Sequence, residues 1–196
     1  GGGNGYTNTM FWLRTGIGVM KFVHPDDTNR DEKEEYIRKK AEPAIRYAEI
    51  LLIYAEALNE LTGNYNIASW DEETQYTIQR NIDEMKKGIQ PIRIRAGIPD
   101  YTRSEYEDQD LFREKLKRER QIELMGEGHR YYDIRRWKDA EVEESLPIYG
   151  CNTLMTEKWR DVFHVPVAIP SLPTNFSRKM YFWPISHSEL KRNKML

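Results

Sequence analysis

Apolar residues recur at every third or fourth position between residues 44 and 61, and this spacing constrains the fold more than any other feature. The set comprises Ala44, Ala48, Leu51, Leu52, Ala55 and Leu58, with Tyr47, Ile50, Tyr54 and Leu61 in a neighbouring stripe. This repeat matches the turn of an α-helix and predicts a helix that is apolar around most of its circumference. Because such a helix must be covered by other elements, we expect it to lie centrally in a helical unit.

Two further segments have helical spacing. The pattern predicts a second helix over 74–90 and a third over 108–125. Gly88 and Pro91 fall late in the second helix, so we expect them to kink or end it. We expect the helices over 44–61 and 74–90 to form an antiparallel, tetratricopeptide-like hairpin, with 108–125 packed across it.

Beyond Ala140 the helical spacing disappears, and prolines at positions 147, 166, 170, 173 and 184 punctuate the chain. We therefore expect a long, loop-rich C-terminal region. The predicted fold class is mainly α, with one helical hairpin, further helices and this tail.

Charge and composition exclude several kinds of partner. The 30 Lys and Arg nearly balance the 32 Asp and Glu, which leaves a formal net charge of -2 and no basic excess for nucleic acid. The single cysteine, Cys151, excludes an internal disulfide. Since the sequence has no zinc-ligand spacing, phosphate-binding glycine loop or dinucleotide fingerprint, we expect neither a metal nor a cofactor.

The segment 119–138 is rich in arginine and glutamate. Glu123 and Glu127 stand four residues apart and allow two interpretations: an acid/base pair, or carboxylates paired with nearby arginines such as Arg118 and Arg120. The second interpretation is favoured, so we expect this segment to be scaffold, with Asp133 paired to Arg136 one turn on.

A similar pair is predicted on the first helix. Arg46 and Glu49 lie one turn apart on an otherwise apolar helix, so we expect them to pair with each other.

The five tryptophans divide by their neighbours. Trp137 and Trp183 stand within apolar patterns, and we expect them in the core. Trp12, Trp70 and Trp159 stand among polar or irregular neighbours, where an exposed ring is expected. We predict Trp12 first and Trp70 second as ligand-binding residues, because exposed rings beside hydrogen-bonding groups form stacking platforms for sugars.

Several segments together resemble the C-terminal part of the SusD/RagB family, the nutrient-binding outer-membrane lipoproteins of Bacteroidota. Residues 46–57 are similar to the most recognisable helix of that family, and 92–99 to its arginine motif. The other similar segments are 15–22, 119–137 and 182–193. Residues 141–175 have no motif that aligns with the family.

The resemblance implies a non-catalytic protein on the extracellular face of the outer membrane of a Gram-negative bacterium. Such a protein captures an oligosaccharide, or less often a peptide, and delivers it to a SusC-like TonB-dependent transporter. Residues 1–196 would be the C-terminal part of a SusD-like domain, and the N-terminal part with its lipid anchor would be absent from this sequence.

Two other classes stay open from the residues alone. One is a cytosolic helical-repeat module that binds protein through its hairpin groove. The other is a glycoside hydrolase that uses Glu123 and Glu127. The sequence does not identify the ligand.

Overall fold

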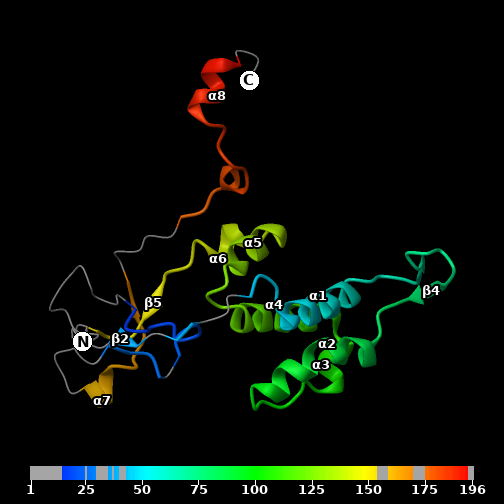
Figure 1. Ribbon diagram of the computed structural model, residues 1–196, viewed down its shortest axis with the longest axis horizontal. Coiled ribbons are helices and arrows are strands. Elements are labelled where there is room, and N and C mark those ends of the chain that lie inside the picture. The colour runs from blue at the N-terminus through cyan, green and yellow to red at the C-terminus, as the bar shows by residue number, and fades with distance from the viewer. Residues whose placement is uncertain are drawn as a thin grey trace. The chain divides into compact units, whose positions relative to one another are not determined.

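The computed structural model describes residues 15–24, 26–29, 35–36, 38–39, 43–153, 159–169 and 175–193, and these residues are mainly helical (Figure 1). They fall into two compact units. One unit lies between residues 25 and 130, and the other combines the residues up to His24 with those from Tyr131 onward. The predicted mainly helical fold is confirmed, while the tetratricopeptide-like character of its helix pair stays a prediction.

The unit between residues 25 and 130 contains the three longest of the described helices and the short helix α3. They are α1 (Tyr47–Asn59), α2 (Ile82–Arg95), α3 (Arg103–Glu107) and α4 (Gln109–Glu123). Two antiparallel strand pairs accompany them: β1 (Thr28–Asn29) with β2 (Glu35–Tyr36), and β3 (Tyr65–Ala68) with β4 (Gln75–Ile78). The predicted helices over 44–61 and 108–125 are confirmed as α1 and α4.

Helices α1 and α2 run antiparallel. Arg80, just before α2, donates to Asn59 at the end of α1 over 3.0 Å, and the start of α1 lines one cavity together with the end of α2. The two helices approach closely at Gly88, where a Cβ atom would lie 2.5 Å from the carbonyl oxygen of Leu51 and 2.8 Å from the Cβ of Ala55. Because both distances are far below van der Waals contact, glycine is the residue that fits this helix separation.

The predicted helix over 74–90 is wrong at both ends. Residues Gln75–Ile78 form β4, and the helix begins after Asn81, whose side chain accepts a hydrogen bond from the backbone N–H of Glu84 at 3.1 Å. It then continues through Gly88 and Pro91 to Arg95 instead of ending before them. Pro91 lies on an exposed side of α2, where water can bond the carbonyl group that the proline ring leaves without a donor.

The core of this unit lies between α1, α2 and the α3–α4 pair. Phe112 and Leu116 of α4 belong to one buried cluster with Leu52 of α1 and Met85 of α2. The remaining buried members are Ala48, Ala55, Leu58, Ile89, Ile92, Tyr106 and Leu124. This single cluster fixes the three main helices relative to one another.

The second unit consists of short elements joined by irregular segments, as expected for the loop-rich tail. Its elements are most of α5 (His129–Arg136), α6 (Ala140–Glu143), β5 (Tyr149–Gly150) paired with β6 (Val167–Ala168), α7 (Trp159–Val162), the 3-10 helix η1 (Arg178–Tyr181) and α8 (His187–Arg192). Ile134, Ala140 and Phe176 form its small core. The predicted pair of Asp133 and Arg136 is confirmed, with 2.9 Å between the Arg136 Nε and the carboxylate.

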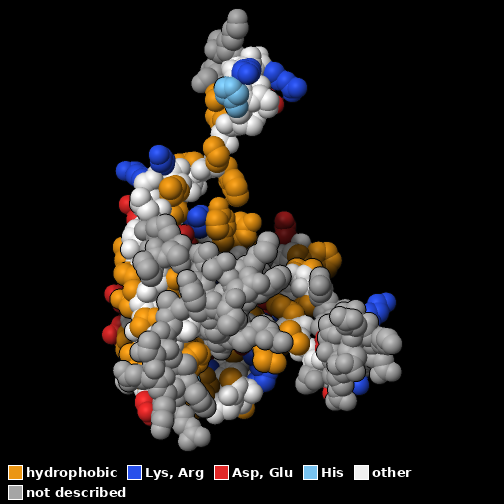
Figure 2. Space-filling model, turned by 90° about the vertical axis from the view of Figure 1, so that its left-hand side faces the viewer, with side chains coloured by type: hydrophobic (Ala, Val, Ile, Leu, Met, Phe, Trp, Pro, Cys, Tyr) orange, Lys and Arg blue, Asp and Glu red, His pale blue; other side chains and the backbone are white. Residues whose placement is uncertain are grey.

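Hydrophobic side chains are exposed along the segment that leads into α8 (Figure 2). Trp183 lies there with 78% of its surface exposed, so the prediction that it belongs to the core is wrong. Its ring packs loosely beside Tyr131, with 6.1 Å between the ring centroids, and one aromatic neighbour is too little to bury an indole. Trp137, by contrast, is half-buried.

Candidate functional site

Trp70 stands in the turn that joins β3 and β4, and 95% of its surface is exposed. The prediction that this ring is exposed is confirmed. The turn is held by backbone hydrogen bonds, from the N–H of Ser69 to the carbonyl of Thr74 at 2.7 Å and from the N–H of Glu72 to the carbonyl of Ser69 at 2.9 Å. Glu72 adopts a φ of 61°, in the left-handed region that tight turns require. The turn therefore holds the backbone on both sides of Trp70.

Three acidic residues, Asp71, Glu72 and Glu73, follow Trp70 directly in the turn. Asp71 accepts hydrogen bonds from the Ser69 hydroxyl and from the backbone N–H of Glu73, the latter at 3.2 Å. The bond from Ser69 is the main reason that the pKa of Asp71 is lowered, so this group is ionised at neutral pH. An exposed indole next to the ionised Asp71 combines a stacking surface with a hydrogen-bond acceptor, which is the chemistry that a sugar ring and its hydroxyl groups require.

Trp12, the first predicted ligand-binding residue, lies outside the described residues. Its role stays a prediction, and so does its placement relative to Trp70. Trp159 begins α7, and its backbone alone is described.

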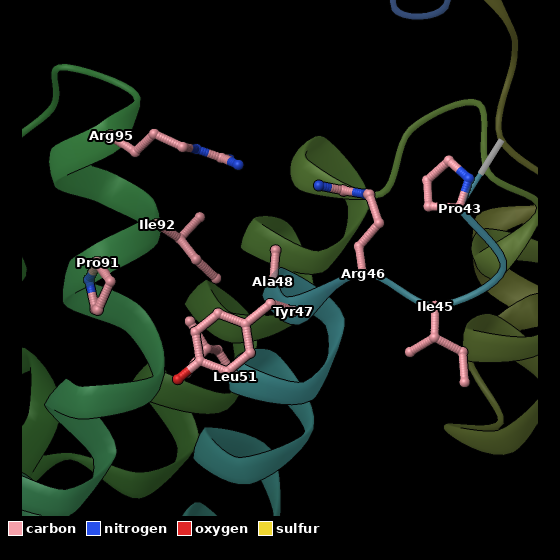
Figure 3. Close-up of a pocket in the computed structure, with 9 residues that line it drawn as sticks. All are labelled: Pro43, Ile45, Arg46, Tyr47, Ala48, Leu51, Pro91, Ile92 and Arg95. Carbon is pink, nitrogen blue, oxygen red and sulfur yellow. The ribbon is translucent and has the colours of Figure 1, made fainter. Parts of the chain in front are cut away.

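A second candidate is a cavity of about 450 Å³ between the start of α1 and the end of α2 (Figure 3). Its lining residues are Pro43, Ile45, Arg46, Tyr47, Ala48, Leu51, Pro91, Ile92 and Arg95. Most of these side chains are apolar, and the two arginines extend toward each other across the opening (Figure 3). Two guanidinium groups close together suggest an anion site. Whether an anion can bind there depends on whether the two arginines already have carboxylate partners.

Both guanidinium groups already hold carboxylates. Arg46 donates from Nε to Glu127 at 2.8 Å and from its terminal nitrogens to Glu123 at 2.9 Å and Glu127 at 2.7 Å. Arg95 donates to the other oxygen of Glu123. Since an added anion would have to displace these carboxylates, the cavity is better suited to apolar groups than to an anion.

The same contacts distinguish the catalytic interpretation of Glu123 and Glu127 from the ion-pair interpretation. Burial raises the pKa of Glu123, but hydrogen bonds from Arg95 and Arg46 outweigh it, so that pKa lies below its usual value. A general acid for glycoside hydrolysis needs a raised pKa, and a carboxylate bound to two arginines has the opposite environment. The ion-pair interpretation is therefore favoured over the catalytic one.

The predicted ion-pair partners need correction. Arg46 does not pair with Glu49 on its own helix but with Glu123 and Glu127 of the α4 end, and Glu49 lies 3.6 Å from Nδ1 of His129. The Arg46 side chain is long enough to reach two carboxylates across the helix interface and binds that of Glu127 in a bidentate geometry. A single glutamate one turn away on the same helix offers fewer hydrogen bonds.

Sequence reasoning also missed a buried cluster that fixes the end of α2. Arg93 forms an ion pair with Glu119, and its guanidinium lies 3.9 Å from the ring centre of Tyr101. The Tyr101 hydroxyl donates to the same carboxylate at 2.6 Å, and burial together with this bond raises the pKa of Tyr101. The signal was present in the sequence, because Glu119, Glu123 and Glu127 recur every four residues and form one stripe along α4 and its end.

The described part of the chain contains neither a metal-binding cluster nor a membrane-spanning helix. No group of three histidine, cysteine, aspartate or glutamate side chains there is arranged to hold a metal ion. Of the helices in that part, none combines the length and the apolar character that crossing a bilayer requires.

The described residues form a helical scaffold with ion pairs between arginines and carboxylates, and one aromatic ring is exposed on a turn. Comparison with known proteins defines the class. A family model for the SusD family matches residues 1–196, and the chain belongs to that family. Proteins of this family are binding proteins rather than enzymes.

Two relatives show how far the similarity extends. SusD-like protein P2 of Formosa agariphila is 37% identical over 155 residues, which cover 78% of this chain and 24% of that protein. The crystal structure of a SusD-like protein from Bacteroides fragilis is 27% identical with a TM-score of 0.55, covering 76% of this chain and 24% of that one. The chain thus spans 24% of the length of each relative.

Proposed function

We propose that this protein binds an oligosaccharide or a similar nutrient at the cell surface, without converting it, and delivers it to a SusC-like TonB-dependent transporter. The observation that carries the proposal is the match of the SusD family over the whole of residues 1–196. The ion-paired state of Glu123 and Glu127 supports a binding role over hydrolysis.

The proposal also covers where the protein acts and the larger domain to which residues 1–196 belong. A transporter-linked protein of this kind acts on the extracellular face of the outer membrane and is held there by an N-terminal lipid anchor, outside this sequence. Residues 1–196 are then the C-terminal part of a larger SusD-like domain. Digestion of intact cells with an external protease tests this location, because a cytosolic helical-repeat protein would be protected.

Within this part of the protein, Trp12 and Trp70 are the proposed ligand contacts. Support for Trp70 comes from its exposed ring, its hydrogen-bonded turn and the ionised Asp71 beside it. Stacking of a sugar on an aromatic ring contributes about 0.5–1.5 kcal/mol, so Trp70→Ala should weaken oligosaccharide binding roughly two- to tenfold without lowering the melting temperature.

The experiment begins with a carbohydrate array probed with the full-length protein, followed by calorimetry on the strongest oligosaccharide. Trp183→Ala is the matched control, because Trp183 is also an exposed indole but lies away from the β3–β4 turn in the sequence. Equal affinities of the Trp70→Ala variant and the unmodified protein would contradict the role of Trp70. Release of shortened sugars during incubation, abolished by Glu127→Gln in a folded variant, would contradict the whole proposal and favour a hydrolase.

A further inference from the structure

The turn of residues 124–128 joins the end of α4 to the start of α5. Gly126 and Gly128 adopt φ values of 80° and 82°, in the left-handed region. Glycine loses more backbone freedom on folding than any other residue, so a turn with two glycines is costly to order. Contacts from outside the turn therefore have to offset that cost. Such contacts are present within the unit between residues 25 and 130.

Carboxylates make the end of α4 electrostatically unfavourable. The C-terminal end of a helix carries a partial negative charge, because its last carbonyl groups have no donor within the helix. Glu123 is the last residue of α4, and Glu127 follows it in the turn. Their side chains keep only 12% and 11% of their surface exposed, so solvent screens them weakly. A cation has to offset these charges for the turn to stay closed.

Arg46, which stands immediately before α1, supplies that cation (Figure 3). Its Nε and Nη2 donate to the two carboxylate oxygens of Glu127 at 2.8 and 2.7 Å. Its Nη1 donates to the carboxylate of Glu123 at 2.9 Å, and Nη2 also donates to the backbone carbonyl of Glu123 at 2.9 Å. One guanidinium thus neutralises both carboxylates and caps the last carbonyl group of α4.

Two further contacts hold the ends of the turn. Arg95, the last residue of α2, bonds the other carboxylate oxygen of Glu123. Glu49, in the first turn of α1, lies 3.6 Å from Nδ1 of His129, the first residue of α5. The start of α1 therefore contacts the chain within the turn and again where α5 begins. These contacts join residues of this chain to one another, so they do not depend on what covers its outer faces.

We propose that Arg46 is a latch that holds the 124–128 turn closed against the start of α1. Loss of its bonds to Glu123 and Glu127 releases the turn and the start of α5, while α1, α2 and α4 stay folded. These helices stay folded because the buried cluster that joins them includes none of the three latch residues. Arg46 is thus a positioning residue for the turn, a role that is independent of the proposed nutrient binding.

Hydrogen exchange of the full-length protein, followed by mass spectrometry, measures the opening of the turn. In Arg46→Met the amides of residues 124–129 should exchange about tenfold faster, because removal of one partner from a partly buried ion pair leaves charge without compensation. Amides within α2 should keep their rates. Arg103→Met is the matched control, since Arg103 forms an exposed ion pair with Glu107, and it should leave exchange at 124–129 unchanged.

A second substitution separates a latch from a side chain that only fills space. Glu127→Gln added to Arg46→Met removes a carboxylate whose charge Arg46 no longer offsets, so exchange at the turn should slow relative to Arg46→Met alone. A role in packing predicts no such rescue, because glutamine and glutamate have nearly the same size. Arg46→Lys should give an intermediate rate, because an ammonium group keeps the charge but lacks the planar fork that binds Glu127.

Three results would overturn the proposal: unchanged exchange at 124–129 in a folded Arg46→Met variant, an equal acceleration throughout α1, α2 and α4, or no rescue by Glu127→Gln. If Arg46→Met fails to fold, Glu127→Gln alone decides. It should accelerate exchange at the turn about threefold, whereas Glu107→Gln in the exposed pair should not, and equal rates in these two variants would refute the latch. Absence of oligosaccharide binding by the unmodified protein would refute the proposed function and leave the latch standing.

Discussion

Gly88→Ala should destabilise the protein, although alanine is the better helix former. In an ordinary helix interior the change stabilises by about 1 kcal/mol. Here the new Cβ atom would lie 2.5 Å from the carbonyl oxygen of Leu51. A normal contact between carbon and carbonyl oxygen is about 3.3 Å, so the helices would have to separate locally by roughly 0.8 Å.

That separation determines how much the free energy of unfolding falls. A gap of roughly 0.5–1 Å forfeits a quarter to a half of the dispersion energy of each contact that it opens, and overpacking a core costs about 1–3 kcal/mol. The backbone of Leu51 cannot rotate away as a flexible side chain would. Because the contact is with backbone, we expect the upper end of this cost, about 3 kcal/mol. Subtracting about 1 kcal/mol for the helix propensity of alanine leaves a net loss of about 2 kcal/mol, equivalent to roughly 4–8 °C in melting temperature for a chain of this size.

Thermal unfolding followed by circular dichroism measures the effect. Gln90→Ala, an exposed position on the same helix, is the control and should change the free energy of unfolding by less than about 0.5 kcal/mol. In an Ala55→Gly background the penalty of Gly88→Ala should shrink but persist, because the contact with the Leu51 carbonyl remains. A higher melting temperature for Gly88→Ala would refute the close approach of α1 and α2.

Two further predictions concern the same unit. Leu52→Ala should lower the free energy of unfolding by about 2–5 kcal/mol in urea titrations, because Leu52 is fully buried, whereas Ile53→Ala on the exposed side should cost about 1 kcal/mol or less. Hydrogen bonds from Lys115 and Thr102 lower the pKa of Glu105 to about 2, so between pH 4.5 and about 2 the unfolded chain binds more protons than the folded one. Stability from this group is present above pH 4.5 and is lost as the pH falls toward 2, so Glu105→Gln should flatten the acid limb of a plot of melting temperature against pH.

Helical periodicity predicted α1 and α4 well because each of these helices buries one regular stripe. The second helix was misplaced because Ile78 fits two patterns. It continues the three- and four-residue spacing of Ile82 and Met85, and it also ends the alternation of Gln75–Ile78. Residues 75–78 form a strand because β3 pairs with them in register. A pattern within residues 75–78 alone cannot reveal that pairing partner. Asn81, which caps α2, was the available signal for the true start of the helix.

The partners of the charged residues were harder to predict than the helices. A partly buried guanidinium needs a carboxylate, and the sequence offered Glu49 close by. The structure instead gives Arg46 two carboxylates, those of Glu123 and Glu127, at separations of 77 and 81 residues. Such a choice depends on how α1 meets α4, so it becomes visible only when the packing is known. The role of Gly88 depends on a neighbouring helix in the same way.

The β3–β4 hairpin shows the converse case, in which the exposure of a ring was predicted from the sequence alone. Trp70 was expected to be exposed because its neighbours are polar, and no tertiary contact had to be known for that. The face on which Ile67 lies depends on register, since a slip of one residue would present Asn66 in its place. Within the described residues, the cluster buried by α1, α2 and α4 includes no member of 65–78. Ordering these residues therefore costs conformational entropy that the helical core does not offset.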